Sequence, residues 1–156
     1  MLVPPIDPLQ IINIMSKWDY RLDDLGGEEG YTFRKIKTGK YRIHIDNSKY
    51  EPRVRFTAAH EIGHIVLNHH KELDMSNLSE IEEDILDKEA NVVAGIILMP
   101  KIHILQNKNY NIDELMNYFK VSKRAMKVRL DFLNLSIVLL DSYNIPSQNK
   151  RGDLNE

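Results

Sequence analysis

The chain has 156 residues, of which 42% are apolar, and this is enough for one domain that buries roughly two thirds of its unfolded surface. Its 21 basic and 23 acidic side chains leave a net charge of −2, which gives no global attraction to nucleic acid or to an anionic membrane. The absence of cysteine excludes disulfides and thiolate-ligated metal sites. The first residues lack the basic and apolar regions of a leader, and the longest apolar run, Val92–Met99, is too short to span a bilayer. We therefore expect a soluble, cytoplasmic protein.

A short helix is expected near the start of the chain. Asp7 followed by Pro8 is a favourable pair for an N-cap and a first helical turn, and Leu9 and Ile12 then recur at helical spacing. We expect this helix to close near Trp18, where the periodicity of the sequence changes.

Alternation typical of β-strands follows over residues 18–46. Apolar or aromatic side chains stand two positions apart on both sides of a turn-like Lys-Thr-Gly-Lys at residues 37–40. They are Tyr31 and Phe33 before the turn and Tyr41, Ile43 and Ile45 after it. The pattern predicts a β-hairpin that packs on the core through one face.

Helical spacing dominates the second half of the chain and predicts four helices. They run from Pro52 through Val66, over Ser79–Pro100, over Asn111–Phe119 and over Ser122–Leu133. A last strand is expected at residues 136–140, and the polar residues 146–156 are expected to form a flexible tail. We therefore predict one α+β domain over residues 1–145, with a small antiparallel hairpin or sheet packed on helices and a helical pair at residues 111–134.

The sequence His-Glu-Ile-Gly-His from His60 to His64 is a candidate metal site. On a helix, residues four apart lie on one face and about 6 Å apart along the axis, so both imidazoles can bind one ion. Glu61 lies one residue round from the first histidine, where it can act as a general base towards a metal-bound water without being a ligand. The competing interpretation is a pair of surface histidines on an amphipathic helix.

Gly63 lies inside the same helix. A glycine there costs on the order of 1 kcal/mol relative to alanine, so a packing reason is expected. We expect it to let another backbone, such as that of the hairpin, approach the site closely.

His70 is one candidate for the third ligand, because it occupies the position of the last histidine in the pattern HExxHxxGxxH. That pattern needs a turn glycine, and Leu67 stands in its place. No residue between His64 and His70 is expected to supply an easy left-handed turn, so a continuing helix would carry His70 to the wrong side. We expect His69 and His70 to be ordinary imidazoles near the end of the helix.

Glu89 is the second candidate. It lies four residues after Ile85 and four before Val93, which places an acid on the expected core-facing stripe of its helix. An unpaired carboxylate is strongly disfavoured there, so it needs a cation. A zinc ion held by His60 and His64 would supply one and leave a fourth position for water.

Other arrangements of this helix remain open. Glu89 could pair with a buried arginine such as Arg55, or reach solvent at the edge of the stripe. Asp84 and Asp87 are expected on the polar side of the helix, which makes them weaker ligand candidates.

Two segments, RFTAAHEIGHIVLNHH and EANVVAGIILMP, resemble the ImmA/IrrE family of bacterial zinc peptidases, in which RFTLAHELGH precedes E-A-N-x-F-A-A-x-L-L-M-P. The similarity extends from the N-terminal Pro-Pro-Ile-Asp-Pro to Leu130. It implies a compact, gluzincin-like (zincin) α+β fold and one zinc ion per chain. His60 and His64 would be its histidine ligands, Glu61 its catalytic base and Glu89 its carboxylate ligand. Departures from the family's pattern, none of them at a ligand, are Ala58, Val92, Val93 and Gly95.

The resemblance implies hydrolysis of a peptide bond by metal-activated water. It further implies a protein substrate, a helix-turn-helix repressor of a phage or other mobile element, and no membrane partner.

Residues 111–134 suggest an alternative function. Two expected helices are separated by Val121-Ser122, and the second carries Lys123, Arg124, Lys127 and Arg129, as in a helix-turn-helix. The protein could then be a regulator that binds DNA or protein without catalysis. Because the net charge of the chain is negative, direct binding to nucleic acid is not expected. We expect these basic residues to form a solvated face.

Overall fold

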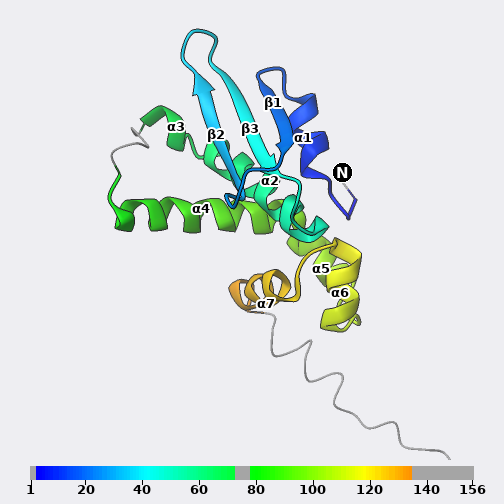
Figure 1. Ribbon diagram of the computed structural model, residues 1–156. Helices are drawn as coiled ribbons and strands as arrows, with labels where there is room; N and C mark the ends of the chain where they lie inside the picture. The colour runs from blue at the N-terminus through cyan, green and yellow to red at the C-terminus, as the bar shows by residue number, and fades with distance from the viewer. Residues whose placement is uncertain (1–2, 73–77, 135–156) are drawn as a thin grey trace, which may run out of the picture.

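Three strands form a small mixed sheet on one side of the molecule, and helices make up the rest (Figure 1). The computed structural model describes residues 3–72 and 78–134. In chain order the elements are α1 (Pro8–Ile14), β1 (Trp18–Asp23), β2 (Gly30–Lys35), β3 (Lys40–Asp46), α2 (Glu51–Val66), α3 (His69–Glu72), α4 (Glu80–Leu98), α5 (Lys101–Gln106), α6 (Ile112–Phe119) and α7 (Lys123–Phe132). The predicted α+β class is confirmed.

The sheet has the strand order β1-β3-β2, so β3 is the central strand. β2 and β3 pair in antiparallel fashion, which confirms the hairpin, and β1 runs parallel to β3. Trp18 begins β1 and does not close the first helix, which ends at Ile14 with Met15 as its C-cap. Trp18, Tyr20 and Leu22 alternate with charged residues in this strand, but none of its side chains is fully buried.

The predicted burial of the hairpin's apolar side chains is correct for β3 and wrong for β2. β3 buries Tyr41, Ile43 and Ile45 as expected. In β2, Tyr31 and Phe33 are both 40% exposed and stack on the His44 ring, so their expected packing on the core is wrong. The alternate residues of β2, Gly30 and Thr32, face α2 instead.

Helix α2 lies between two hydrophobic clusters. One joins it to the sheet and α1 and contains Ile12, Tyr41, Ile43, Ile45, Ala58, Ile62 and Ile65. The other joins it to α4 and the carboxyl-terminal helices and contains Ala59, Ala94, Leu98, Met99, Ile104, Leu115, Phe119, Val121, Met126 and Leu130. In Figure 1 the sheet stands on one side of α2 and α4, and α5–α7 lie on the other.

Helix α4 begins as predicted but buries a different face. Ser79 is its N-cap and forms the expected capping box with Glu82. The expected apolar stripe through Ile85 is wrong, because Ile85 is 50% exposed. The buried residues are Leu86, Ala90, Ala94, Gly95 and Leu98. Small residues dominate this face because α4 packs very closely on α2, and bulky side chains would hold the two helices apart.

Gly63 explains this close approach. A Cβ atom built on Gly63 would lie 2.9 Å from both the Cα atom and the carbonyl oxygen of Ala90. The backbone that approaches Gly63 is therefore that of α4, and the expectation that the hairpin would do so is wrong.

The carboxyl-terminal helical pair is confirmed as α6 and α7, with Asn111 and Ser122 as N-caps. The expected strand at residues 136–140 and the tail at residues 146–156 lie outside the described residues, and the domain boundary at 145 stays a prediction. No helix among residues 3–72 and 78–134 has the length and hydropathy needed to cross a membrane.

Replacing Gly63 by alanine tests the contact between α2 and α4. The added methyl group would meet Ala90 backbone that cannot move aside alone, so we expect the free energy of unfolding to fall by about 1–3 kcal/mol in urea titrations. Gly95→Ala is the matched control, because its Cβ would meet only the Arg129 Cδ atom at 3.6 Å. We expect that helical substitution to be neutral or to stabilise by up to about 1 kcal/mol. Equal losses in both variants would contradict the close approach.

Candidate metal centre

Three potential ligand atoms converge between α2 and α4. The Nε2 atoms of His60 and His64 are 3.0 Å apart. Oδ1 of Asp87 lies 3.6 Å from the first of these nitrogens and 3.3 Å from the second. In a tetrahedral zinc site with ligands at about 2.0–2.1 Å, neighbouring ligand atoms are roughly 3.3 Å apart. These residues therefore form a donor set of the right chemistry and spacing for a metal ion.

Glu89 lies elsewhere. Its Oε2 atom is 3.2 Å from Nε2 of His69, and its side chain is 56% exposed. The expectation that Glu89 faces the core is wrong, because its side chain is 56% exposed. The Asp87 side chain is also exposed, at 61%, but its Oδ1 atom is directed at the two imidazoles. Arg55 is not its partner either, since that guanidinium donates to the carbonyl oxygens of Ile6 and Lys120. Among the described residues, Asp87 and not Glu89 contributes the third atom of this cluster, and Glu89 as a metal ligand stays a prediction.

His70 does not join the ligand atoms that converge on the metal site. A left-handed turn does follow α2, contrary to expectation, because Asn68 adopts a φ of 62°. This turn folds His69 back onto His64, with the Nδ1 atoms of the two rings 2.9 Å apart. The His70 ring lies near His64 as well, at 5.9 Å between ring centroids. His69 is buried, so the expectation of an ordinary imidazole at a helix end is wrong for it.

Hydrogen bonds at the far side of each ring fit metal binding through Nε2. Nδ1 of His60 lies 2.9 Å from the Asn91 amide oxygen, which can only accept, so that nitrogen carries the proton. Nδ1 of His64 has a partner in His69. If each Nδ1 is protonated, two lone pairs face each other across 3.0 Å, an arrangement that calls for a cation.

Burial keeps the histidines neutral. The pKa of His64 is lowered to about 3, mainly by burial and further by the neighbouring imidazoles. Burial also lowers the pKa of His60. Both rings are therefore in the unprotonated form that binds metal at neutral pH.

Glu61 lies beside the cluster and is 6% exposed. Burial raises its pKa to about 7, although a hydrogen bond that Thr32 Oγ1 donates to its Oε2 (2.7 Å) acts in the opposite direction. A base with a pKa near neutrality is well suited to both accept and release a proton. Thr32 was not predicted as a site residue, and the alternation of β2 would have identified it only if the inward face of that strand had been chosen correctly.

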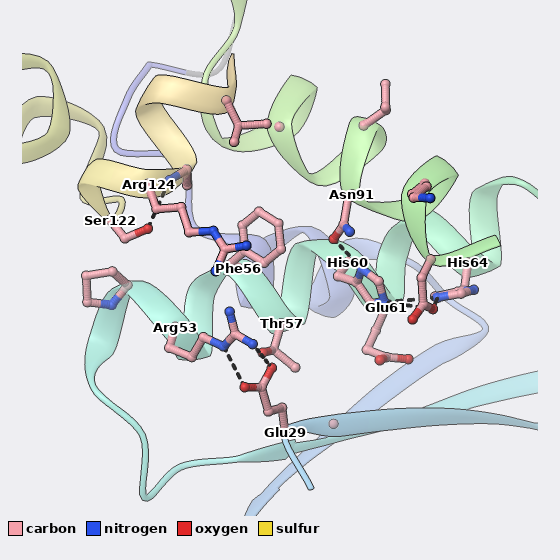
Figure 2. A pocket seen from close by; sticks show the side chains of 18 of the residues that line it. Glu29, Arg53, Phe56, Thr57, His60, Glu61, His64, Asn91, Ser122 and Arg124 are labelled. Atoms are coloured by element: carbon pink, nitrogen blue, oxygen red, sulfur yellow. Dashed lines mark hydrogen bonds and ion pairs between the residues drawn. The ribbon is translucent and has the colours of Figure 1, made fainter. Parts of the chain in front are cut away.

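The site opens into a cleft of about 1020 Å³ lined by residues of β2, α2, α4 and α7. Figure 2 shows His60, Glu61 and His64 at one end of this cleft and Arg124 at the other, with Phe56 between them. The two ends of the cleft differ in chemistry, with imidazoles and carboxylates at one end and a guanidinium at the other.

The burial of Glu61 predicts a specific pH dependence. Its pKa rises from an ordinary 4.5 to about 7 on folding, so its contribution to stability is complete below pH 4.5 and is lost as the pH rises through 7. In metal-free protein we expect Glu61→Gln to gain stability relative to the wild type over this range, by up to about 3 kcal/mol. Urea unfolding of both proteins measures the difference, in which the opposite effects of the histidines cancel. A difference that does not change with pH would contradict the raised pKa.

Comparisons with known proteins agree with the fold. The sequence profile of the IrrE N-terminal-like domain, peptidase M78, matches residues 19–131. A search of the curated proteins gave no match. Among solved structures, a Mycobacterium tuberculosis transcriptional regulator is similar, with a TM-score of 0.59 and 18% identity over 84% of this chain and 42% of that chain. At that identity the likeness shows a shared fold, and this chain spans less than half of that protein's length.

The profile match covers most of the chain and includes both helices that supply the converging ligand atoms. It extends from β1 to the end of α7, and thus contains the sheet, the cleft and the carboxyl-terminal pair. The chain therefore belongs to the IrrE N-terminal-like domain family, the M78 peptidases.

Proposed function

We propose that the protein is a zinc-dependent endopeptidase. The observation that carries the proposal is the convergence of His60, His64 and Asp87 beside the buried carboxylate of Glu61, at one end of an open cleft. Two imidazoles and one carboxylate leave a fourth position of a tetrahedral zinc ion open, which is typical of catalytic rather than structural sites.

Each residue around the site has its own role in hydrolysis. Zinc bound at this site would lower the pKa of a coordinated water towards about 7 and polarise the scissile carbonyl. Glu61 takes the proton of the attacking water and delivers it to the leaving amine. Thr32 holds the Glu61 carboxylate by its 2.7 Å hydrogen bond. Asn91 and His69 accept from the ligand histidines and fix their ring orientations.

An extended substrate fits beside β2. β3 is paired on both sides and offers no free edge. β2 has one neighbour, β3, in the part of the chain that the structure describes, and its residues Gly30, Tyr31 and Thr32 line the cleft. We propose that the substrate backbone adds to this free edge as a further strand.

The proposed substrate is a helix-turn-helix repressor of a phage or other mobile element, and the support for it is the family resemblance. The alternative, a regulator that binds DNA through α6 and α7, is less well supported. Arg129 is buried and donates its Nε–H to the Met99 carbonyl oxygen, and Lys123 pairs with Asp113. Two of the four basic residues of α7 are thus engaged within the protein.

Metal content tests the ligand set. We expect one zinc per chain in the wild type and little in His60→Ala, His64→Ala or Asp87→Ala, because each removes one of three converging atoms. His70→Ala should keep the metal. Elemental analysis of proteins purified without chelator or added metal provides the measurement.

Other results of the metal analysis would contradict this ligand set. If Glu89→Ala lost the zinc while Asp87→Ala kept it, Glu89 would be the third ligand, as the sequence predicted. A wild type that holds no zinc and cannot be loaded would overturn the proposed function.

Glu61→Gln tests catalysis separately from metal binding. We expect it to retain zinc and to lose roughly 10²- to 10⁴-fold in the rate of repressor cleavage, the usual size of a general-base contribution. Mass spectrometry of repressor fragments after incubation with zinc-loaded protein measures the rate. Equal cleavage by the wild type and Glu61→Gln would assign the activity to a contaminant or exclude Glu61 as the base.

A further inference from the structure

The end of the cleft opposite the metal centre carries a guanidinium. Arg124 lies near the start of α7 and lines the cleft. Figure 2 shows its side chain extending from α7 towards Phe56 of α2, into the space between the two helices. Because Arg124 is exposed, a molecule bound in the cleft can reach its guanidinium.

The other basic side chains that line the cleft are engaged within the protein. Arg53 and Lys88 form ion pairs with carboxylates, and the buried Arg129 donates to a backbone carbonyl oxygen. The Arg124 guanidinium makes no ion pair or hydrogen bond with any residue in the described part of the chain. Its planar set of N–H donors is therefore available, and that set matches a carboxylate in a bidentate arrangement.

One face of α7 forms this wall of the cleft. Arg124, Val128 and Phe132 are four residues apart, so they lie on the same side of the helix, and each lines the cleft. Val128 is 62% exposed and Phe132 is 60% exposed. Large apolar side chains left exposed in a concave site, beside one polar group that fixes orientation, are typical of a binding surface.

We infer that this end of the cleft is a specificity subsite for a peptide with an acidic side chain. Arg124 binds the Asp or Glu carboxylate, and Val128 and Phe132 contact an apolar residue next to it. The inference rests on the proposed function and narrows its substrate class to peptides with an acid at one fixed position relative to the cleaved bond. Since Arg124 lies at the end of the cleft away from the metal centre, it selects the substrate and takes no part in the chemical step.

A nucleic-acid phosphate is the other ligand that a guanidinium commonly binds. The peptide is favoured because the cleft that holds Arg124 is also lined by carboxylates, among them Glu29 and Glu83, which repel a polyanion. Binding to a phosphate backbone usually takes several basic side chains on one face. Lys127, the exposed lysine of α7 nearest in sequence to Arg124 on its carboxyl side, does not line the cleft.

The experiment captures peptides on immobilised, zinc-loaded Glu61→Gln protein, which is expected to bind a substrate without cleaving it. The probe is a synthetic peptide library randomised at every position, and mass spectrometry identifies the retained peptides. We expect Asp and Glu to be enriched among them. Adding Arg124→Glu should replace this preference by one for Lys and Arg, because the charge at the subsite is reversed.

Lys127→Glu in the same Glu61→Gln background is the matched control, since it makes the same change of charge on an exposed residue of α7 outside the cleft. It should keep the preference for acids. Arg124→Lys retains the charge but loses the bidentate geometry, so we expect it to bind a retained acidic peptide roughly 10-fold more weakly in fluorescence anisotropy titrations. Because both residues are exposed, these variants are expected to fold.

Three results would overturn the inference: retained peptides without an excess of acids, no retained peptides, or an equal change in Arg124→Glu and Lys127→Glu, which would show a general charge effect. Binding of a DNA duplex that weakens in Arg124→Glu, with no peptide retained, would assign the guanidinium to a phosphate instead. If the wild type cleaves the repressor but the capture shows no preference for acids, only this inference fails. If acidic peptides are retained through Arg124 but the zinc-loaded wild type cleaves neither them nor the repressor, the subsite stands and the proposed function fails.

Discussion

The close approach of α2 and α4 is the constraint on which the site depends. Gly63 presents no side chain to α4, and the backbone of Ala90 occupies the space that a Cβ atom would fill. At this separation Asp87 on one helix reaches the imidazoles of His60 and His64 on the other. The ligand atoms are thus positioned by two packed helices, and helices hold such geometry more rigidly than loops do.

The same packing sets the chemistry of the site. Burial between the helices and the sheet disfavours every charged form, so it lowers the pKa of His64 and raises that of Glu61. Both shifts suit the proposed roles. A histidine ligand must be neutral, and a general base works best when its pKa lies near the pH at which the enzyme operates. Thr32 limits the shift at Glu61 by donating a hydrogen bond to the charged form.

What the sequence could predict was local. The N-cap at Asp7, the capping box at Ser79 and the pair of histidines four residues apart all depend on neighbours within one helical turn, and all were placed correctly. Asp87 and Thr32 could not be placed because their roles are decided by segments distant along the chain. Hydropathy was misleading on α4, because the exposed isoleucines are more hydrophobic than the buried alanines.

Two signals in the sequence could have predicted the positions of Asp87 and His69. The glycine inside the histidine motif and the small residues Ala90, Ala94 and Gly95 are typical of two helices in close contact, and the acid nearest that face is Asp87. Asn68 offered the left-handed turn that no residue between His64 and His70 was expected to supply. Both signals concern backbone geometry, which a count of apolar side chains does not capture.

The carboxyl-terminal helices share a continuous core with the metal-binding helix. Ala59 of α2, Ala94 of α4 and Phe119 of α6 belong to one buried cluster, and Arg129 of α7 donates to the carbonyl oxygen at the end of α4. Helices α6 and α7 are therefore not a removable appendage. A truncation within them would expose the apolar underside of α2 and α4, so a stable fragment that keeps the candidate metal centre cannot end before Leu130.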